Sequence, residues 1–165
     1  MQESFMRRAI EIARESLGEA GALPYAAVIV RDGLIVGEGL NRVNGRHDPT
    51  SHGEVEAIRD ACARLGTIDL AGCDLYTTAE PCSMCVATMY LAGISRFYYA
   101  SAMPESSAFL ARIAAHDPRW QRRIGGRDLR REVGLPMEQR QMQAIPLLPE
   151  EVHALFDDFA IRHGA

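Results

Sequence analysis

The sequence predicts an α/β protein that folds as a single domain. Its 165 residues are enough to close one hydrophobic core around a sheet. After an initial helix and hairpin, segments typical of helices and strands alternate, which indicates parallel strands joined by crossover helices. Apolar residues make up 47% of the chain and charged residues 24%, a balance typical of globular proteins. We therefore expect one active centre and no internal repeat.

The first elements are predicted to be a helix and a β-hairpin. Apolar residues recur at helical spacing over residues 3–17, so this segment is expected to be an amphipathic helix that covers one face of the sheet. Residues 25–30 and 34–40 are apolar, β-prone runs. Asp32-Gly33 lies between them and favours a tight reversal of the chain. The two runs are therefore predicted to pair as a hairpin.

A loop and a second helix should follow the hairpin. Residues 41–50 are rich in turn-forming residues and show no periodicity, so they are expected to form a loop. Apolar residues then recur at helical spacing. Thr50 or Ser51 is the expected cap of this helix, and Gly66 is expected to end it.

Further elements are predicted along the remaining chain. The middle part should contain a strand, a buried helix and another strand, over residues 73–78, 82–91 and 96–100. The last third should contain a helix, a final strand and a terminal helix, over residues 104–115, 141–148 and 150–162.

Charge and cysteine content narrow the class of function. The net charge is −4, and a mildly acidic chain lacks the general attraction for polyanions that dedicated nucleic-acid binders show. No run approaches the roughly 20 apolar residues of a membrane span, and the charged start lacks the apolar core of a signal peptide. A cytoplasmic protein is expected. Its four cysteines then suit metal binding or packing better than disulfides, because the cytosol keeps thiols reduced.

Two short motifs carry the chemistry. His52-Gly53-Glu54 is followed by Pro81-Cys82-Ser83-Met84-Cys85, which together match H-x-E and P-C-x-x-C, the signature of zinc deaminases. Cys82 and Cys85 are three residues apart at a helix start, so both sulfurs fall on one side of its first turn. Unpaired N–H groups there favour the thiolate, the form that binds metal.

The predicted site is a catalytic zinc centre with one Zn²⁺ per chain. His52, Cys82 and Cys85 supply three ligands of borderline and soft type, which suits zinc and leaves the fourth position to water. Glu54 lies two residues from His52, near enough to move protons as the catalytic acid and base without binding the metal.

The cysteine pattern also has two other interpretations. A C-x-x-C pair alone is also typical of thioredoxin-like redox motifs, but the upstream H-x-E motif argues against that function. A closed structural zinc site needs a fourth ligand, and neither Cys62 nor Cys73 has the required spacing. These two cysteines are expected to be core thiols.

At these residues the chain resembles the cytidine deaminase-like superfamily, in the branch of bacterial guanine deaminase, bacterial tRNA adenosine deaminase and fungal cytosine deaminase. The resemblance covers roughly residues 1–101, with matches at Asn41, residues 48–50 and the two motifs. It implies a three-layer α/β/α cytidine deaminase-like fold with a central, mostly five-stranded mixed sheet. It also implies a homodimer. Residues 1–101 would be the catalytic core, and residues 102–165 would form the substrate pocket, a lid and the oligomerisation segment.

The resemblance does not point to a single substrate, because different motifs are similar to different deaminases. Asp48-Pro49-Thr50 is similar to guanine deaminase and tRNA adenosine deaminase, both of which usually carry Ala where this chain has Gly53. His-Gly-Glu and the segment 75–78, Leu-Tyr-Thr-Thr, are more similar to fungal cytosine deaminase. Guanine, cytosine and aminotriazines therefore remain candidate substrates.

Residues for substrate binding are suggested in the same way. The resemblance implies that the Asn41 side chain and the Gly53 amide hydrogen-bond the base, although Asn41 is also a common turn residue. Tyr25 could stack on a flat ring or be plain core. Guanine deaminase closes its pocket with an acidic residue and a C-terminal tail, for which Glu105, Asp157 and Asp158 are candidates. A solvated helix face is the alternative for Asp157 and Asp158.

The leading hypothesis is hydrolysis of the exocyclic amine of a small nucleobase-like substrate, with water as co-substrate and no membrane or nucleic acid as partner. The alternative is tRNA adenosine deamination, for which the arginines between residues 119 and 131 are the best support. Acidic residues are interleaved with them, which favours a solvated or intersubunit face. A non-catalytic zinc or redox module is the third hypothesis, and Glu54, which coordination does not require, argues against it.

Overall fold

The computed structural model describes residues 2–164, and it has two compact units. The first reaches Arg130 and the second begins at Arg131, inside a helix. The elements, in chain order, are α1 (Gln2–Glu15), β1 (Leu23–Arg31), β2 (Leu34–Asn41), α2 (Val43–Arg46), α3 (Gly53–Leu65), β3 (Asp74–Ala79), α4 (Ser83–Leu91), β4 (Arg96–Ser101), α5 (Met103–Ala114), α6 (Gly126–Gly134) and α7 (Pro149–Arg162), with 3-10 turns at Pro118–Trp120 and Met137–Gln139.

The first unit is built on a four-stranded mixed sheet with the order β2-β1-β3-β4. β1 pairs antiparallel with both β2 and β3, whereas β3 and β4 are parallel and joined through α4. The expectation of a mostly five-stranded sheet is wrong in strand number. Residues 141–148, the predicted last strand, lie in the second unit as exposed irregular chain, where no described strand offers them a pairing edge.

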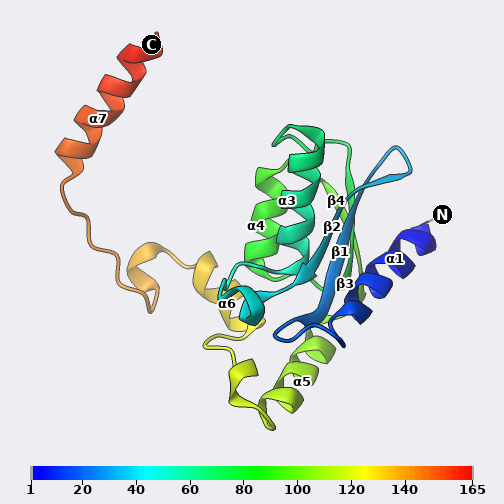
Figure 1. The fold of residues 1–165 in the computed structure, drawn as a ribbon. Helices are drawn as coiled ribbons and strands as arrows, with labels where there is room; N and C mark the ends of the chain where they lie inside the picture. Colours follow the sequence, from blue (N-terminus) through cyan, green and yellow to red (C-terminus); the bar gives the residue numbers. More distant parts are fainter. Residues whose placement is uncertain (1, 165) are drawn as a thin grey trace. The chain divides into compact units, whose positions relative to one another are not determined.

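Helices cover both faces of the sheet, which gives the expected three-layer α/β/α arrangement (Figure 1). The side chains of β1 alternate between the two faces, as the pleat of a strand requires. Ala27 and Ile29 pack in the core shared with α3 and α4. Ala26 and Val28 pack in the core shared with α1. The sheet therefore has two buried faces, and the prediction that the first helix covers one of them is confirmed.

The hairpin between β1 and β2 is confirmed at its turn. Asp32 has a φ of 51° and Gly33 a φ of 77°. Two central residues with positive φ define the type I′ turn, whose twist matches that of the paired strands. Glycine adopts this conformation without steric cost, and Asp is among the residues that tolerate it.

The start of α3 lies unusually close to β2. A Cβ built on Gly39 would stand 2.2 Å from the Gly53 carbonyl oxygen and 2.3 Å from the Ala57 nitrogen. Only a residue without a side chain fits between these two backbones. The close packing holds the first turn of α3, which carries the H-x-E motif, against the sheet.

The predicted cap of α3 is wrong, whereas its predicted end is confirmed. His52 is the N-cap residue, and no side-chain cap hydrogen bond is formed. The two expected caps have other partners: the Thr50 hydroxyl lies 2.7 Å from Asp48 Oδ1, and the Ser51 hydroxyl lies 3.1 Å from Glu56 Oε1. Gly66 ends the helix in the left-handed conformation. The short helix α2 interrupts the segment 41–50, which was expected to be a loop throughout.

The second unit contains the end of α6, a 3-10 turn and the predicted terminal helix α7. The Arg140 guanidinium donates to the carbonyl oxygen of Leu135 at 2.9 Å. Leu155, Phe156 and Phe159 of α7 are each 62% exposed. None of the helices in the described part of the chain combines the length and apolar character needed to cross a membrane.

Candidate metal centre and pocket

Three ligand-type atoms converge at the start of two helices. His52 is the N-cap residue of α3, Cys82 is the N-cap residue of α4, and Cys85 lies in the first turn of α4. The Cys82 and Cys85 sulfurs are 3.7 Å apart. His52 Nδ1 is 3.7 Å from the Cys82 sulfur and 3.4 Å from the Cys85 sulfur. Residues 30 positions apart in the sequence thus form one compact cluster.

These spacings fit tetrahedral zinc. Bonds of about 2.3 Å to sulfur and about 2.0–2.1 Å to nitrogen put two sulfurs about 3.8 Å apart, and a sulfur and a nitrogen about 3.6 Å apart. The observed spacings of 3.7, 3.7 and 3.4 Å lie close to these values. Among the described residues, the cluster holds no fourth His, Cys or carboxylate ligand. It therefore has the open position typical of a catalytic zinc site.

Of the other two cysteines, one lies in the core as expected and one packs against it, partly buried. Cys73 is 1% exposed and belongs to the cluster between the sheet and helices α3 and α4. Cys62 packs against the same cluster, and burial raises the pKa of its thiol. Neither belongs to the metal-binding group.

The contact between the two motif cysteines shifts the pKa values of their thiols in opposite directions. The hydrogen bond between the two sulfurs, helped by His52, lowers the pKa of Cys82 to about 4. The same hydrogen bond and burial raise the pKa of the Cys85 thiol. Burial opposes a charged His52, but its contact with the Cys82 thiolate outweighs this and raises the pKa of the imidazole. The cluster is thus prepared to carry negative charge, which attracts a cation.

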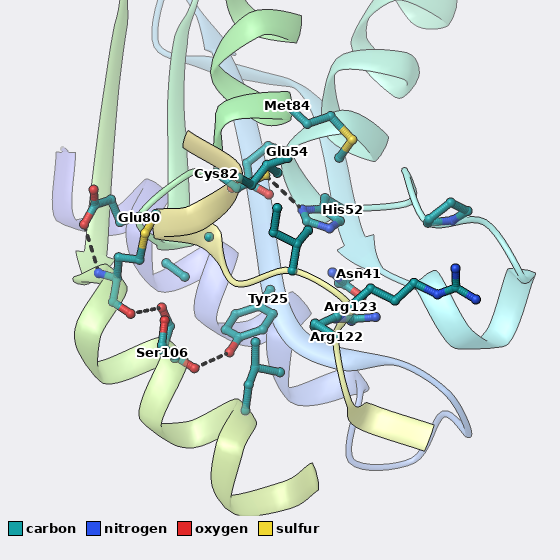
Figure 2. A pocket seen from close by; sticks show the side chains of 18 of the residues that line it. Tyr25, Asn41, His52, Glu54, Glu80, Cys82, Met84, Ser106, Arg122 and Arg123 are labelled. Carbon is teal, nitrogen blue, oxygen red and sulfur yellow. Dashed lines mark hydrogen bonds between the residues drawn. The ribbon is translucent and has the colours of Figure 1, made fainter. Parts of the chain in front are cut away.

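Glu54 lies beside this cluster in the first turn of α3. Its side chain is buried and lines the same pocket as His52 and Cys82 (Figure 2). Burial raises the pKa of its carboxyl group. A buried carboxyl next to three candidate metal ligands, but outside their cluster, has the placement required of a group that exchanges protons with a reacting molecule.

The cluster opens into a pocket of about 470 Å³. Asn41, at the end of β2, lines it and is 2% exposed. The Asn41 side-chain oxygen accepts from the Val43 N–H at 3.4 Å, which leaves the amide NH₂ group as the donor. Tyr25, from β1, also lines it; its hydroxyl donates to the Ser106 carbonyl at 3.1 Å, and its ring packs edge-on against Phe109.

The structure brings most of the sequence-predicted residues together. Asn41, Tyr25 and Glu54 line the pocket with two of the three candidate ligands. Gly53 lies at the start of α3, between the candidate ligand His52 and Glu54. Asp157 and Asp158 lie exposed on α7 in the second unit, and their role in substrate binding remains a prediction.

Sequence reasoning missed one wall of the pocket. This wall includes Glu80, Met103 and Ser106, and the residues Gln121 to Ile124. The Glu80 carboxylate accepts from the Met103 N–H at 2.9 Å and from Arg130 at 3.0 Å, and so fixes the start of α5. For Glu80, the available sequence signal was its position just before Pro81-Cys82. No periodicity marks residues 121–124.

A second network of side-chain contacts, centred on Glu56 of α3, holds the segment that leads into His52. The side chain of Glu56 is only 10% exposed and pairs with two arginines, Arg46 and Arg59, the latter at 2.7 Å. It also accepts from the Ser51 hydroxyl at 3.1 Å. These contacts fasten the segment just before His52 to the helix that begins after it.

With this geometry established, comparison with known proteins identifies the family. The family model for the "cytidine and deoxycytidylate deaminase zinc-binding region" matches residues 1–101. That range includes Glu54 and all three candidate ligands. The chain belongs to this family of zinc-dependent deaminases, and its His/Cys/Cys group fits one Zn²⁺.

Within the family, individual relatives are similar over most of the chain. Guanine deaminase of Bacillus subtilis is 46% identical over 99 residues, which are 60% of this chain and 64% of that protein. A crystal structure of guanine deaminase from Bacillus subtilis matches with a TM-score of 0.82 and 32% identity, over 100% of this chain and 96% of that one. tRNA-specific adenosine deaminase of Agrobacterium fabrum is 43% identical over 104 residues, covering 63% of this chain and 68% of that protein.

Proposed function

We propose that the chain is a zinc-dependent hydrolytic deaminase that removes the exocyclic amine of a free nucleobase or a related heterocycle as ammonia. One observation carries the proposal: the His52, Cys82 and Cys85 cluster and the carboxyl of Glu54 lie at the same pocket. The similarity to guanine deaminase over most of the chain supports guanine as the first substrate to try.

The proposed chemistry assigns different roles to the ligands and to Glu54. When bound by His52, Cys82 and Cys85, Zn²⁺ supplies a Lewis acid that lowers the pKa of a water molecule to roughly 7. Glu54 takes a proton from the attacking water and passes it to a ring nitrogen. It then carries the second proton to the amine as the carbon–nitrogen bond breaks. The products are an oxo-heterocycle and ammonia, which balances the atoms of substrate and water.

Substrate positioning falls to the other end of the pocket. The Asn41 amide group donates towards the ring, and Tyr25 forms a wall that its hydrogen bond to Ser106 holds in place. The Gly53 amide is a further donor in this proposal. A pocket of about 470 Å³ suits a small molecule, since ligand sites commonly range from about 300 to 1,000 Å³.

tRNA adenosine deamination is the second candidate function, because a tRNA-specific relative is 43% identical to the chain. Two observations weigh against it. The net charge is −4. Two of the arginines that would contact phosphates are paired with acids: Arg119 with Asp117 at 2.7 Å and Arg130 with Glu80 at 3.0 Å.

Assembly and location belong to the same proposal. We propose a homodimer in the cytoplasm, with residues 102–165 contributing to the pocket, a lid and the subunit contact. Support for a reducing compartment comes from the cysteines, because all four are free and two belong to the metal cluster. Exposed apolar side chains on α7 support a contact surface in that segment.

Ammonia release tests the function. The zinc-loaded protein would be assayed with guanine, cytosine, isocytosine, aminotriazines, adenine, their nucleosides and an anticodon stem-loop RNA. Turnover of a free base or related small heterocycle supports the proposal and identifies the ring. Turnover confined to the RNA would overturn it in favour of the second candidate.

A further inference from the structure

The pocket contains an arginine that its own surroundings do not neutralise. Arg122 lines the cavity and is partly buried, and burial lowers the pKa of its guanidinium. Within residues 2–164, no carboxylate forms an ion pair with it. Two nearby arginines differ, since Arg119 is paired with Asp117 and Arg130 with Glu80. Arg123 lines the same pocket and, among the described residues, likewise forms no ion pair, but it is exposed whereas Arg122 is partly buried.

The two carboxylates that line the pocket interact with groups other than Arg122. Glu80 accepts from the Met103 N–H and from Arg130, which uses both of its oxygens. Glu54 is buried at the metal cluster, where its charge acts on the ligands His52 and Cys82. A partly desolvated cation without a partner is costly, and a bound anion can relieve that cost.

Arg122 also lies at the right place to meet a substrate. Figure 2 shows its side chain on the same side of the pocket as Asn41. Arg122, Tyr25 and His52 line the same pocket, so the guanidinium shares one cavity with the metal cluster. A heterocycle with its amine at the metal would therefore present another edge to Arg122.

Donor groups line the pocket together with Arg122. Asn41 offers its amide NH₂ group, because its oxygen already accepts from Val43. Tyr25 uses its hydroxyl proton on the Ser106 carbonyl. The guanidinium of Arg122 adds a planar set of donors whose spacing matches the oxygens of a carboxylate or phosphate. Such a surface selects for acceptors and for negative charge.

We propose that Arg122 determines specificity by binding an anionic group of the substrate, so that the preferred substrate is an aminated heterocycle that carries a carboxylate or a phosphate. This inference rests on the proposed deaminase function and adds the substrate class. The pocket volume of about 470 Å³ leaves room for a substituent beside the ring.

Binding to matched pairs of compounds tests the proposal. Each pair shares a ring and differs in the charged group: pterin and pterin-6-carboxylate, cytosine and 5-carboxycytosine, guanosine and its 5′-monophosphate. Calorimetry would use the zinc-loaded Glu54→Gln protein, which is expected to bind without turnover. We expect the charged member of at least one pair to bind at least about tenfold more tightly, the scale of a charge-assisted hydrogen bond. The pairs also separate a carboxylate from a phosphate.

Variants connect this preference to one residue. Arg122→Ala and Arg122→Gln, each combined with Glu54→Gln, should lose the tenfold advantage of the charged compound and retain the weaker binding of the neutral one. Arg127→Ala removes the same charge from an exposed position on α6 outside the pocket, and it should keep the advantage. Thermal unfolding and bound zinc would show that each variant is folded.

Three results would overturn the proposal: equal binding of both members in every pair, an advantage that survives both Arg122 variants, or Arg122-dependent binding of an anticodon stem-loop without any advantage for the small anions. The proposed function fails separately. If free bases are deaminated and no charged compound is preferred, the deaminase stands and the anion site falls. If charged compounds bind through Arg122 and nothing is deaminated, the anion site stands and the deaminase function falls.

Discussion

The backbone of Gly53 lies directly against that of Tyr25. A Cβ built on Gly53 would stand 2.7 Å from the Tyr25 carbonyl oxygen and 2.8 Å from Ala26 Cα. Real Cβ atoms do not approach backbone atoms so closely, so any side chain at this position would push the start of α3 away from β1. His52 and Glu54 flank Gly53, which links the missing side chain to the position of the candidate metal ligand and of the proposed catalytic acid and base.

We therefore predict that Gly53→Ala destabilises the protein by about 1–3 kcal/mol, the usual cost of overpacking. It should also weaken zinc binding, because His52 shifts with the helix start. Denaturant unfolding and zinc titration measure the two effects. Gly134→Ala is the control, since the described residues leave open space around Gly134. A Gly53→Ala protein as stable as that control would show that α3 adjusts without strain.

Glu56 provides a second test, of the network that fixes the segment before His52. Glu56→Gln should cost about 1–3 kcal/mol of unfolding free energy, because it removes a largely buried charge that pairs with Arg46 and Arg59. Glu3→Gln breaks the exposed Glu3–Arg7 pair, whose side chains are 87% and 74% exposed, and should change stability by less than about 1 kcal/mol. Equal effects of the two substitutions on chemical unfolding would contradict the structural role given to Glu56.

Substituting a cysteine of the metal cluster and substituting a cysteine outside it should affect zinc binding differently. Cys82→Ser removes a ligand and should weaken zinc binding by more than about 100-fold, since outer partners of a metal site alone contribute about 10–100-fold. Cys62→Ser should leave about one zinc per chain, because Cys62 packs against the core. Zinc content after dialysis against a chelator compares them. Loss of zinc from the Cys62 variant, or its retention by the Cys82 variant, would mean that the ligand set is different.

Local pattern predicted the elements well where one residue decides the geometry. Asp32-Gly33 fits a type I′ turn and Gly66 fits a helix end, and both residues adopt the positive φ that these structures need. The metal cluster could be predicted from the sequence for a related reason. A spacing of three residues fixes the relative direction of Cys82 and Cys85 once a helix begins there.

Features that depend on partners distant in sequence were not predictable. Residues 141–148 have β propensity, but a strand also needs a free edge beside it. Thr50 and Ser51 are good caps by residue type, yet Asp48 and Glu56 engage their hydroxyls. The pocket wall that contains Arg122 comes from irregular chain, whose path no periodicity encodes.

The central claim is that Glu54 moves protons and does not hold the metal. Glu54→Ala and Glu54→Gln should each lower kcat by at least about 100-fold, the lower range for general acid–base catalysis, while bound zinc stays near one per chain. The decisive measurement is ammonia release and zinc content on the same preparations, with the base that the unmodified protein deaminates. Loss of zinc together with activity, or activity near that of the unmodified protein, would contradict the role given to Glu54.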